Sequence, residues 1–403
     1  MSSIAKRSVA EPQPQAQPPL ELPSFAAAAA RALPASERLA AWTVIACWWA
    51  LSRACVLVTA AIVQIVRWPH GNWYPSFTSH PFAVLGAWDG RWYRMVAAHG
   101  YLVLPGHQSD TAFFPFFPAL LRAGLALGLP LDATGLIVAN GCLLFALGAV
   151  YELNRLWTTE AVARRAAVYA AVFPVGYVFS MVYPESVVLL AVGAASVLGA
   201  RGRWGAAAVA AAVASLTRPE GLLLTSIPLA ALAIRTWRAA DDRARIRALS
   251  AVAAGPAAIA GLCAYHWRLF GDPFVFSEAQ RAWGRALEPD GIWRAVVELV
   301  HAPSHAGSWL FRDAAFCVLY IALLAVARRV GVPWEWIGAS ALVVLLPLWS
   351  GSFTSDARFG LLAIPIYTGL AHAASSRWRD YAVRASSLVL LAAGTATILL
   401  RWP

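Results

Sequence analysis

The sequence predicts an all-α polytopic membrane protein. Of its 403 residues, 60% are hydrophobic and only 13% are charged, whereas a typical soluble domain is about 45–50% apolar and about 25% charged. The apolar residues form long runs, and the 19 Trp residues suit the two membrane–water interfaces. These features exclude a soluble enzyme. The net charge of +11 does not indicate nucleic-acid binding, because most of the excess lies in short loops between the apolar runs.

The chain divides into a short tail and one membrane domain. Residues 1–38 are rich in Pro, Gln, Ala and Ser and lack a continuous apolar run, so we expect a disordered cytoplasmic tail. Residues 39–403 form the predicted transmembrane domain. A span needs about 20 apolar residues. The clearest candidates cover residues 42–66, 134–153, 166–182, 186–200, 249–270, 309–327, 334–349, 359–374 and 386–400.

The apolar run 204–234 is interrupted by a polar segment that contains Arg218, Pro219 and Glu220. It forms either one long crossing or two short helices in a hairpin. Cytoplasmic loops are rich in Lys and Arg, and only the hairpin leaves all the basic loops on one side. We therefore predict about 11 spans, with the N-terminus in the cytoplasm. The basic segments are the N-terminal tail and residues 155–165, 201–203, 235–247, 328–329 and 377–384.

Two long loops, about residues 67–133 and 271–308, then lie on the extracytoplasmic side. In the first loop, Trp88, Trp92 and Met95 recur at helical spacing, which predicts a helix lying in the membrane interface. The other polar segments on this side are short and occur where one apolar helix turns into the next. We expect any chemistry to occur on this side of the membrane.

Asp89 directly follows Trp88 at the start of the predicted interfacial helix. A carboxylate in this place could accept a proton from an attacking hydroxyl, which is the role of a general base. It could equally be an N-cap that binds free backbone N–H groups of the helix. The neighbouring side chains that could complete a site are Trp88, Arg91, Tyr93 and His99.

Charged residues also occur at the helix ends on the extracytoplasmic side. Glu185 follows Tyr183, Glu220 follows Arg218, and Arg358 precedes an apolar run. Ionisable groups at membrane depth are costly and are therefore functional candidates. A guanidinium suits phosphoryl oxygens, so Arg218 could bind a phosphate. The alternative is an Arg218–Glu185 or Arg218–Glu220 ion pair that only fixes the helix ends.

Three further features are open to two interpretations. Residues 110–118 contain four Phe and two Pro residues, which suit a rigid surface for a lipid chain or an ordinary interface segment. The second long loop combines aromatic residues with Gln280 and Arg281, a mixture that suits sugar or headgroup contact but also an ordinary amphipathic loop. Arg53 lies inside the first span and requires a partner or access to water.

Together and in this order, these segments resemble the PIG-V-type GPI mannosyltransferases and their bacterial relatives. The first match is Trp88-Asp89 with Tyr93, residues 99–101, and the Phe-Pro segment 112–118. The resemblance covers about residues 40–375. The remaining matching motifs are Ser52-Arg53, Phe173-Pro174 with residues 183–186, residues 216–221, Gly271-Asp272-Pro273 with Gln280 and Trp283, and Arg358-Phe359 with Pro365.

The resemblance implies a membrane glycosyltransferase of the GT-C type that uses a polyprenyl-phosphate-sugar donor outside the cytoplasm. It implies that Asp89 is the catalytic base. The family motifs also carry Arg53, Glu185, Arg218 and Arg358, and we assign donor-phosphate binding to Arg218 and Arg358 on physical grounds. Polyprenyl phosphate is a good leaving group, so no metal or other cofactor is required. The composition, rich in Ala and Arg, indicates a bacterial cell membrane, where GPI is an improbable acceptor.

The resulting hypothesis is an inverting mannosyl (or related hexosyl) transferase that acts on an extracytoplasmic glycolipid or glycan. Its partners would be the lipid-linked donor, the acceptor and membrane lipid, and the sequence does not indicate an oligomeric state. A transporter or flippase of a lipid-linked sugar is the alternative from another class, although no internal repeat supports it. A non-catalytic partner subunit is a third possibility.

Overall fold

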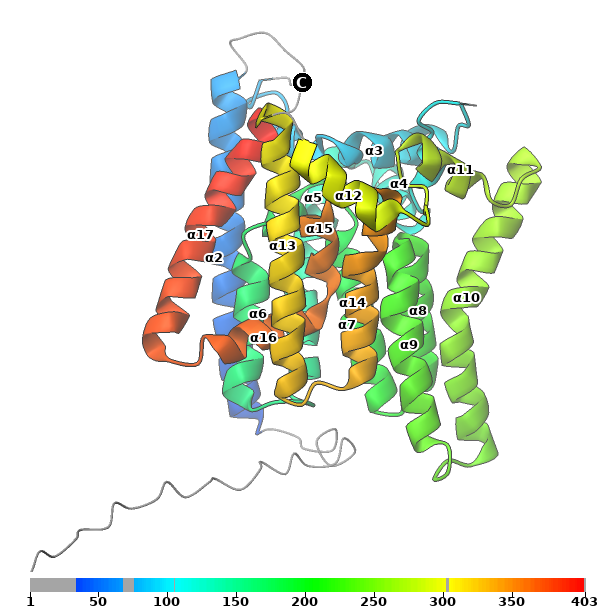
Figure 1. Cartoon of the computed structure of the whole chain (residues 1–403), viewed down its shortest axis with the longest axis vertical. Coiled ribbons are helices and arrows are strands. Elements are labelled where there is room, and N and C mark those ends of the chain that lie inside the picture. Colours follow the sequence, from blue (N-terminus) through cyan, green and yellow to red (C-terminus); the bar gives the residue numbers. More distant parts are fainter. Residues whose placement is uncertain (1–33, 68–75, 105, 302–303, 402–403) are drawn as a thin grey trace, which may run out of the picture.

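The computed structural model describes residues 34–67, 76–104, 106–301 and 304–401, and all the regular elements in these residues are helical (Figure 1). Short 3₁₀ segments connect several of the α-helices. The elements are α2 (Ala35–Arg67), η2 (Ala83–Gly86), α3 (Asp89–His99), η3 (Asp110–Ala112), α4 (Phe116–Ala126), α5 (Leu131–Asn154), α6 (Glu160–Val172), η4 (Gly176–Ser180), α7 (Glu185–Ala200), α8 (Trp204–Thr217), α9 (Pro219–Thr236), α10 (Asp242–Phe270), α11 (Val275–Ala282), α12 (Gly291–His301), α13 (Ser304–Arg329), α14 (Trp334–Leu345), η5 (Leu346–Ser350), α15 (Asp356–Phe359), η6 (Gly360–Leu362), α16 (Ile364–Ala373) and α17 (Arg377–Leu400).

Five helices in the described part of the chain are long and apolar enough to cross a bilayer. Their outward side chains are large and hydrophobic: Val318 on α13 is 71% exposed and Val389 on α17 is 68% exposed. Side chains of this kind are stable against lipid rather than water. The predicted helical membrane fold is therefore confirmed. The five helices are Ala35–Arg67, Leu131–Asn154, Asp242–Phe270, Trp309–Arg329 and Arg377–Leu400.

The two ends of the helical bundle differ in structure (Figure 1). The short helices α3, α4, α11 and α12 lie together at the upper end of the view. The connections α9–α10, α13–α14 and α16–α17 lie at the lower end, and basic residues such as Arg235, Arg329 and Arg377 stand in the helix ends beside them. The short helices of the two long loops and these connections are thus at opposite ends of the bundle (Figure 1).

The polar break at Arg218 is a helical hairpin. Helix α8 ends at Thr217, Arg218 is extended (φ −157°, ψ 148°), and Pro219 begins α9. Proline suits the first position of a helix, where its missing N–H would have no partner. Helix α9 returns closely against α8, since a Cβ on Gly221 would lie 2.2 Å from the Ala214 carbonyl oxygen. This hairpin confirms the preferred alternative for residues 204–234.

Some of the predicted spans are wrong as single helices. In the run 166–182, helix α6 ends at Val172, and Phe173-Pro174 leads into η4. The run 359–374 divides into α15, η6 and α16, and the run 334–349 divides into α14 and η5. Proline breaks each run because it lacks an N–H donor. Residues 166–182 are also almost completely buried in protein. Hydropathy does not distinguish an apolar segment buried in protein from one that faces lipid.

The boundaries of the tail and of the first loop also differ from prediction. Residues 1–33 lie outside the described residues, and α2 begins at Ala35 rather than after residue 38. Helix α4 begins at Phe116, within the Phe-Pro segment, and includes Pro118 in its first turn. The first turn of a helix tolerates proline, since its N–H groups have no intrahelical partner.

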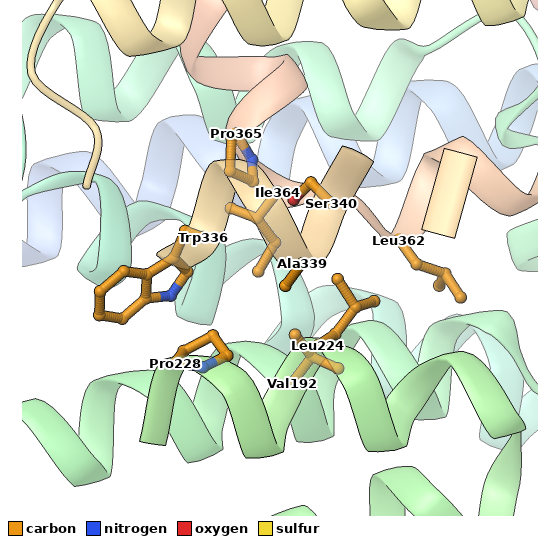
Figure 2. A pocket seen from close by; sticks show the side chains of 9 residues that line it. All are labelled: Val192, Leu224, Pro228, Trp336, Ala339, Ser340, Leu362, Ile364 and Pro365. Atoms are coloured by element: carbon orange, nitrogen blue, oxygen red, sulfur yellow. The ribbon is translucent and has the colours of Figure 1, made fainter. Parts of the chain in front are cut away.

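A small pocket lies between α9, α14 and the segment that leads into α16 (Figure 2). Its lining is almost entirely apolar, with the Ser340 hydroxyl as an exception. The pocket contains none of the charged residues that the sequence indicated, so it is a packing feature of the core. Its lining residues are Val192, Leu224, Pro228, Trp336, Ala339, Ser340, Leu362, Ile364 and Pro365.

Candidate active site

Asp89 is the first residue of α3 and is held by strained backbone on its N-terminal side. Trp88, the N-cap, has φ +56° and ψ −126°, a conformation that a bulky L-residue rarely adopts. The Trp88 indole N–H donates to the Ile398 carbonyl of α17 (3.2 Å), and the Asp89 backbone N–H donates to the Tyr183 hydroxyl (3.1 Å). These bonds fix the direction of the Asp89 side chain. Strain of this kind is frequent at functional sites.

The Asp89 carboxylate pairs with Arg358. The Nη1 atom of Arg358 donates to Asp89 Oδ2 at 2.5 Å, and the N-cap position of α3 is occupied by Trp88 rather than by Asp89. The N-cap alternative for Asp89 is therefore wrong. A quarter of the Asp89 side chain is exposed (25%), compared with 18% of Arg358. The pair consequently lies at the boundary between the protein interior and its surroundings.

Arg358 is positioned by the short helix α15. The residue before α15, Ser355, has φ +73°, and its backbone N–H donates to Asp313 Oδ2 at 2.7 Å. The Tyr320 hydroxyl donates to the Ala357 carbonyl at 2.6 Å. Both partners belong to α13, so this long helix sets the position of α15 and thereby of the Arg358 side chain.

Behind this pair lies a second ion-pair network around Arg218. The guanidinium donates through Nη1 to Glu185 Oε1 (2.7 Å), and through Nη2 and Nε to the two oxygens of Glu220 (2.8 and 3.1 Å). The Glu185 side chain is only 1% exposed. Both ion pairs of the structural alternative for Arg218 are thus present, and they join the start of α7 to the α8–α9 turn.

Arg358 connects the two networks. Its Nε atom lies 3.5 Å from Glu185 Oε1, while its Nη1 atom binds Asp89. The guanidinium also lies over the Tyr183 ring, 5.4 Å from the centroid. Burial and the nearby Asp89 carboxylate raise the pKa of the Tyr183 hydroxyl well above its usual range, so it stays protonated at neutral pH. Asp89, Tyr183, Glu185 and Arg358 therefore form one connected polar cluster.

A third arginine, Arg285, completes the cation arrangement and was not among the residues singled out from the sequence. The guanidinium carbons of Arg218, Arg285 and Arg358 lie 5.3, 5.3 and 5.5 Å from the centroid of the Phe359 ring. Such contacts are favourable cation–π interactions. Arg285 comes two residues after Trp283, so the mixed character of this loop was the signal that could have identified it.

The aromatic side chains of the first loop form a packed cluster rather than an open surface. Phe113 and Phe117 are 7% and 0% exposed, and both rings pack edge-on against Tyr93. Trp92 stacks on Phe113, and Trp283 of the second loop contacts both rings. The expectation that residues 113–117 offer a surface to a prenyl chain is therefore wrong for the rings of Phe113 and Phe117, because the protein itself covers them.

The remaining predicted site residues lie apart from the charged cluster. Arg91 and His99 are exposed on α3 and make none of the cluster contacts found in the described residues. Gln280 donates to the Ala112 carbonyl (3.2 Å), which joins α11 to η3. Arg53 is 3% exposed, and its partners are the Ala171 and Gly176 carbonyls and the Ser180 hydroxyl. In the structure, these contacts tie α11 to η3 and α2 to the segments around α6 and η4.

Sequence reasoning also missed the ion pair that holds α3 in place. Arg94 Nη1 lies 2.8 Å from Asp132 Oδ1, and Arg94 Nη2 donates to the Gly86 carbonyl. This pair fixes α3 against the start of α5 and so orients Asp89. A basic residue five positions after Asp89, on a helix expected to lie in the interface, gave no indication of its distant partner.

The acidic residues do not converge on a metal. Among the residues that the structure describes, no group of three or more His, Cys, Asp or Glu side chains could hold a metal ion. Asp110 is 3% exposed and accepts the Leu102 backbone N–H at 2.7 Å, which fixes the loop instead. The chemistry that the cluster itself offers is proton acceptance by Asp89 beside anion binding by guanidinium groups.

No protein-family model matches this sequence, and no curated protein matches it. The chain is similar to solved structures of the Archaeoglobus fulgidus oligosaccharyltransferase. The apo form aligns at 13% identity with a TM-score of 0.39 and covers 85% of this chain and 55% of that one. The complex with Zn and sulfate aligns at 14% identity with a TM-score of 0.39, and the alignment covers 85% of this chain and 53% of that one. AglB from the same organism, in complex with an inhibitory peptide and a dolichol-phosphate, aligns at 13% identity with a TM-score of 0.41. This alignment covers 85% of this chain and 55% of that one.

This chain therefore spans about half the length of those oligosaccharyltransferase chains. At TM-scores of 0.39–0.41 the alignments transfer no residue role and no activity. The functional argument for this protein accordingly rests on its own residues.

Proposed function

We propose that this protein is a membrane glycosyltransferase of the GT-C type that transfers a mannosyl or related hexosyl residue from a polyprenyl-phosphate-sugar donor. The acceptor would be an extracytoplasmic glycolipid or glycan. The observation that carries the proposal is the Asp89–Arg358 pair, a partly exposed carboxylate held against a guanidinium at 2.5 Å. Acid–base catalysis needs the carboxylate, and charge stabilisation of a leaving phosphate needs the guanidinium.

In the proposed reaction, Asp89 accepts the proton of the acceptor hydroxyl. The hydroxyl oxygen attacks the anomeric carbon and forms the new glycosidic bond. The bond from that carbon to the phosphate oxygen breaks on the opposite face, so the configuration inverts. The electron pair leaves with the phosphate, and Arg358 stabilises the charge that develops there.

The ion pair gives this reaction an order. In the structure, the Nη1 donor of Arg358 occupies the Oδ2 atom of Asp89. A donor phosphate that binds Arg358 would compete with Asp89 for the same N–H donor. Donor binding would thereby release Asp89 to accept the acceptor proton, so we infer that the donor binds before the acceptor reacts.

The same proposal includes the orientation of the protein. Lys- and Arg-rich loops stay in the cytoplasm, and the basic connections lie at the end of the bundle opposite to α3, α11 and α12 (Figure 1). We infer that the N-terminus is cytoplasmic, that residues 39–403 act as one membrane domain, and that the Asp89 cluster faces the extracytoplasmic side of a bacterial membrane.

The test is a transfer assay in membranes that contain the protein and a labelled polyprenyl-phosphate mannose. Wild-type protein is expected to form a new glycosidic bond, and Asp89→Asn is expected to lower the rate by about 10²–10⁴-fold. The control Asp290→Asn removes an exposed carboxylate at the same end of the molecule and is expected to retain activity. Full activity of Asp89→Asn at normal expression would remove Asp89 as the base. Label that only changes leaflet, without a new bond, would identify a flippase instead.

A further inference from the structure

Arg285 is held in place by the end of α11. Gly284 adopts φ +69°, its N–H donates to the Arg281 carbonyl (2.9 Å), and the Arg285 N–H donates to the Gln280 carbonyl (2.8 Å). This pair of bonds is the Schellman motif, which reverses the chain after a helix. Glu288 N–H then donates to the Trp349 carbonyl at 2.8 Å. The loop is thus tied to the segment that precedes α15, and the Arg285 side chain is directed by backbone contacts on both sides.

Among the described residues, no carboxylate pairs with the Arg285 guanidinium, unlike the other two arginines. Arg218 pairs with Glu185 and Glu220, and Arg358 pairs with Asp89. Arg285 donates through Nη2 to the Thr354 carbonyl (2.7 Å), while its Nη1 atom is buried without a hydrogen-bond partner in the described part of the chain. A buried charged donor without a partner is costly. Such a donor is therefore expected where a ligand supplies the missing acceptor.

Arg285 and Arg358 meet on one aromatic ring. Both guanidinium groups lie within 5.5 Å of the Phe359 centroid, and Phe359 itself is only 8% exposed. Burial and the like charge of Arg358 both lower the pKa of Arg285. An anion placed between these two groups would relieve their repulsion and satisfy the free donor of Arg285.

We propose that Arg285 and Arg358 together bind the phosphate of the lipid-linked donor, with Arg285 as the permanent anion contact and Arg358 as the contact that Asp89 releases. This assignment rests on the proposed function and deepens it, because it transfers the phosphate-binding role from Arg218 to Arg285. A phosphodiester donor presents two free oxygens, one for each guanidinium. Planar guanidinium groups bind such oxygens with paired, charge-assisted hydrogen bonds.

The experiment measures binding rather than turnover, so that its outcome is independent of whether sugar transfer is observed. Purified full-length protein in detergent is titrated with farnesyl phosphate, with the neutral alcohol farnesol and with inorganic phosphate. Wild type is expected to bind farnesyl phosphate and to discriminate strongly against farnesol. Arg285→Gln is expected to bind farnesyl phosphate about 10- to 100-fold more weakly, since a hydrogen bond to a charged group is lost.

The matched control is Arg281→Gln, which removes an exposed arginine of the same loop and is expected to leave the affinity unchanged. Arg285→Lys keeps the charge without the planar fork, so its affinity should lie between those of wild type and Arg285→Gln. Thermal stability is measured in parallel. Arg285→Gln removes one hydrogen bond to a carbonyl but no ion pair of the described residues, so it should lower the melting temperature much less than Arg218→Met, which breaks two ion pairs.

Each outcome decides between the two proposals. Unchanged farnesyl phosphate affinity in Arg285→Gln, or in Arg285→Lys if the first variant does not fold, overturns the role of Arg285. Equal binding of inorganic phosphate and farnesyl phosphate overturns the assignment to a lipid-linked donor, because the site would then recognise a free anion. Binding that depends on Arg285 in a protein that forms no glycosidic bond supports the phosphate site and overturns the transferase proposal.

Discussion

Arg358 Nη1 lies 2.5 Å from Asp89 Oδ2, although 269 positions of the chain separate the two residues. Asp89 directly follows Trp88, which has φ +56°. Arg358 lies three positions after Ser355, which has φ +73°. Two turns with strained backbone thus bring a carboxylate and a guanidinium into contact. The contact joins α3 to the short helix α15.

The first prediction concerns the charge on Arg358. In the transfer assay, Arg358→Gln is expected to reduce the rate by roughly 10²–10³-fold, the cost of removing one stabilising donor from a developing anion. Arg358→Lys should recover only part of this loss, because an ammonium cannot contact Asp89 and Glu185 with the geometry of a guanidinium. Arg268→Gln, which alters an exposed arginine at the end of α10, serves as the control. Wild-type rates in Arg358→Gln would contradict the leaving-group role.

The second prediction concerns Arg218, to which the contacts assign a structural role. Arg218→Met leaves Glu220, which is 14% exposed, without its cation. It leaves Glu185, which is 1% exposed, with only the longer 3.5 Å contact to Arg358. Breaking a buried ion pair on one side costs roughly 3–5 kcal/mol. We therefore expect a large fall in the free energy of unfolding, measured by thermal or denaturant unfolding in detergent.

The control and the rescue for Arg218 are both available in the chain. Arg243→Met removes an exposed arginine and should leave stability almost unchanged. The triple variant Glu185→Gln, Arg218→Met, Glu220→Gln has no unpaired charge at this place and should regain much of the lost stability. A neutral effect of Arg218→Met alone, combined with weaker binding of farnesyl phosphate, would return Arg218 to the phosphate site.

The third prediction concerns the α8–α9 hairpin. A Cβ on Gly221 would lie 2.2 Å from the Ala214 carbonyl oxygen, and backbone cannot yield as a flexible side chain can. Gly221→Ala is therefore expected to destabilise the protein, because it pushes α9 away from α8 at the turn that holds Arg218. A Cβ on Gly205, in the same helix α8, meets no atom within 4 Å. Gly205→Ala should be neutral or stabilising by up to about 1 kcal/mol, and equal effects of the two changes would refute the close approach.

The fourth prediction concerns pH. Burial, with a further contribution from the nearby Asp313, raises the pKa of the Asp356 carboxyl to about 7, against 3.8 for an ordinary aspartate. Between these two values the folded state holds a proton that the unfolded state has lost. Stability should consequently fall as pH rises from about 4 to about 7, by up to ~1.4 kcal/mol per pH unit, and then stay constant.

The measurement for Asp356 is the free energy of unfolding at a series of pH values from 4 to 8. Asp356→Asn should abolish the fall assigned to this carboxyl, because the amide does not titrate. Asp290→Asn, at an exposed carboxylate, should keep the slope of the wild type. An unchanged slope in Asp356→Asn would show that other groups cause it.

Several features of this fold could be predicted from local sequence. Long apolar runs predicted the membrane helices, because only a helix satisfies its own backbone hydrogen bonds in lipid. The polar break at Arg218, judged by the positions of basic residues, predicted the α8–α9 hairpin. Runs such as 166–182 were misjudged, since an apolar segment buried in protein has the same hydropathy as one that faces lipid.

Most residues of the candidate site could be predicted from the sequence, but the contacts between them could be predicted only in part. The motifs identified Asp89, Glu185, Arg218, Glu220 and Arg358 as ionisable residues that are costly to place at membrane depth. In the structure all five are buried or half-buried. Local pattern could not choose between a base and an N-cap for Asp89, or between a ligand contact and an ion pair for Arg218. Arg285 escaped notice because an arginine in a polar loop is ordinary until its neighbours are known.

Local sequence was enough to establish that this protein is a bundle of membrane helices and to identify the polar residues that interrupt its apolar runs. The reason is that hydropathy and helical hydrogen bonding act locally along the chain. The tertiary structure alone decided which charges meet: Asp89 with Arg358, Arg218 with two glutamates, and Arg285 with no carboxylate at all in the described residues. Electrostatic partners depend on distances between helices that are remote in sequence, and these distances arise only when the helices pack.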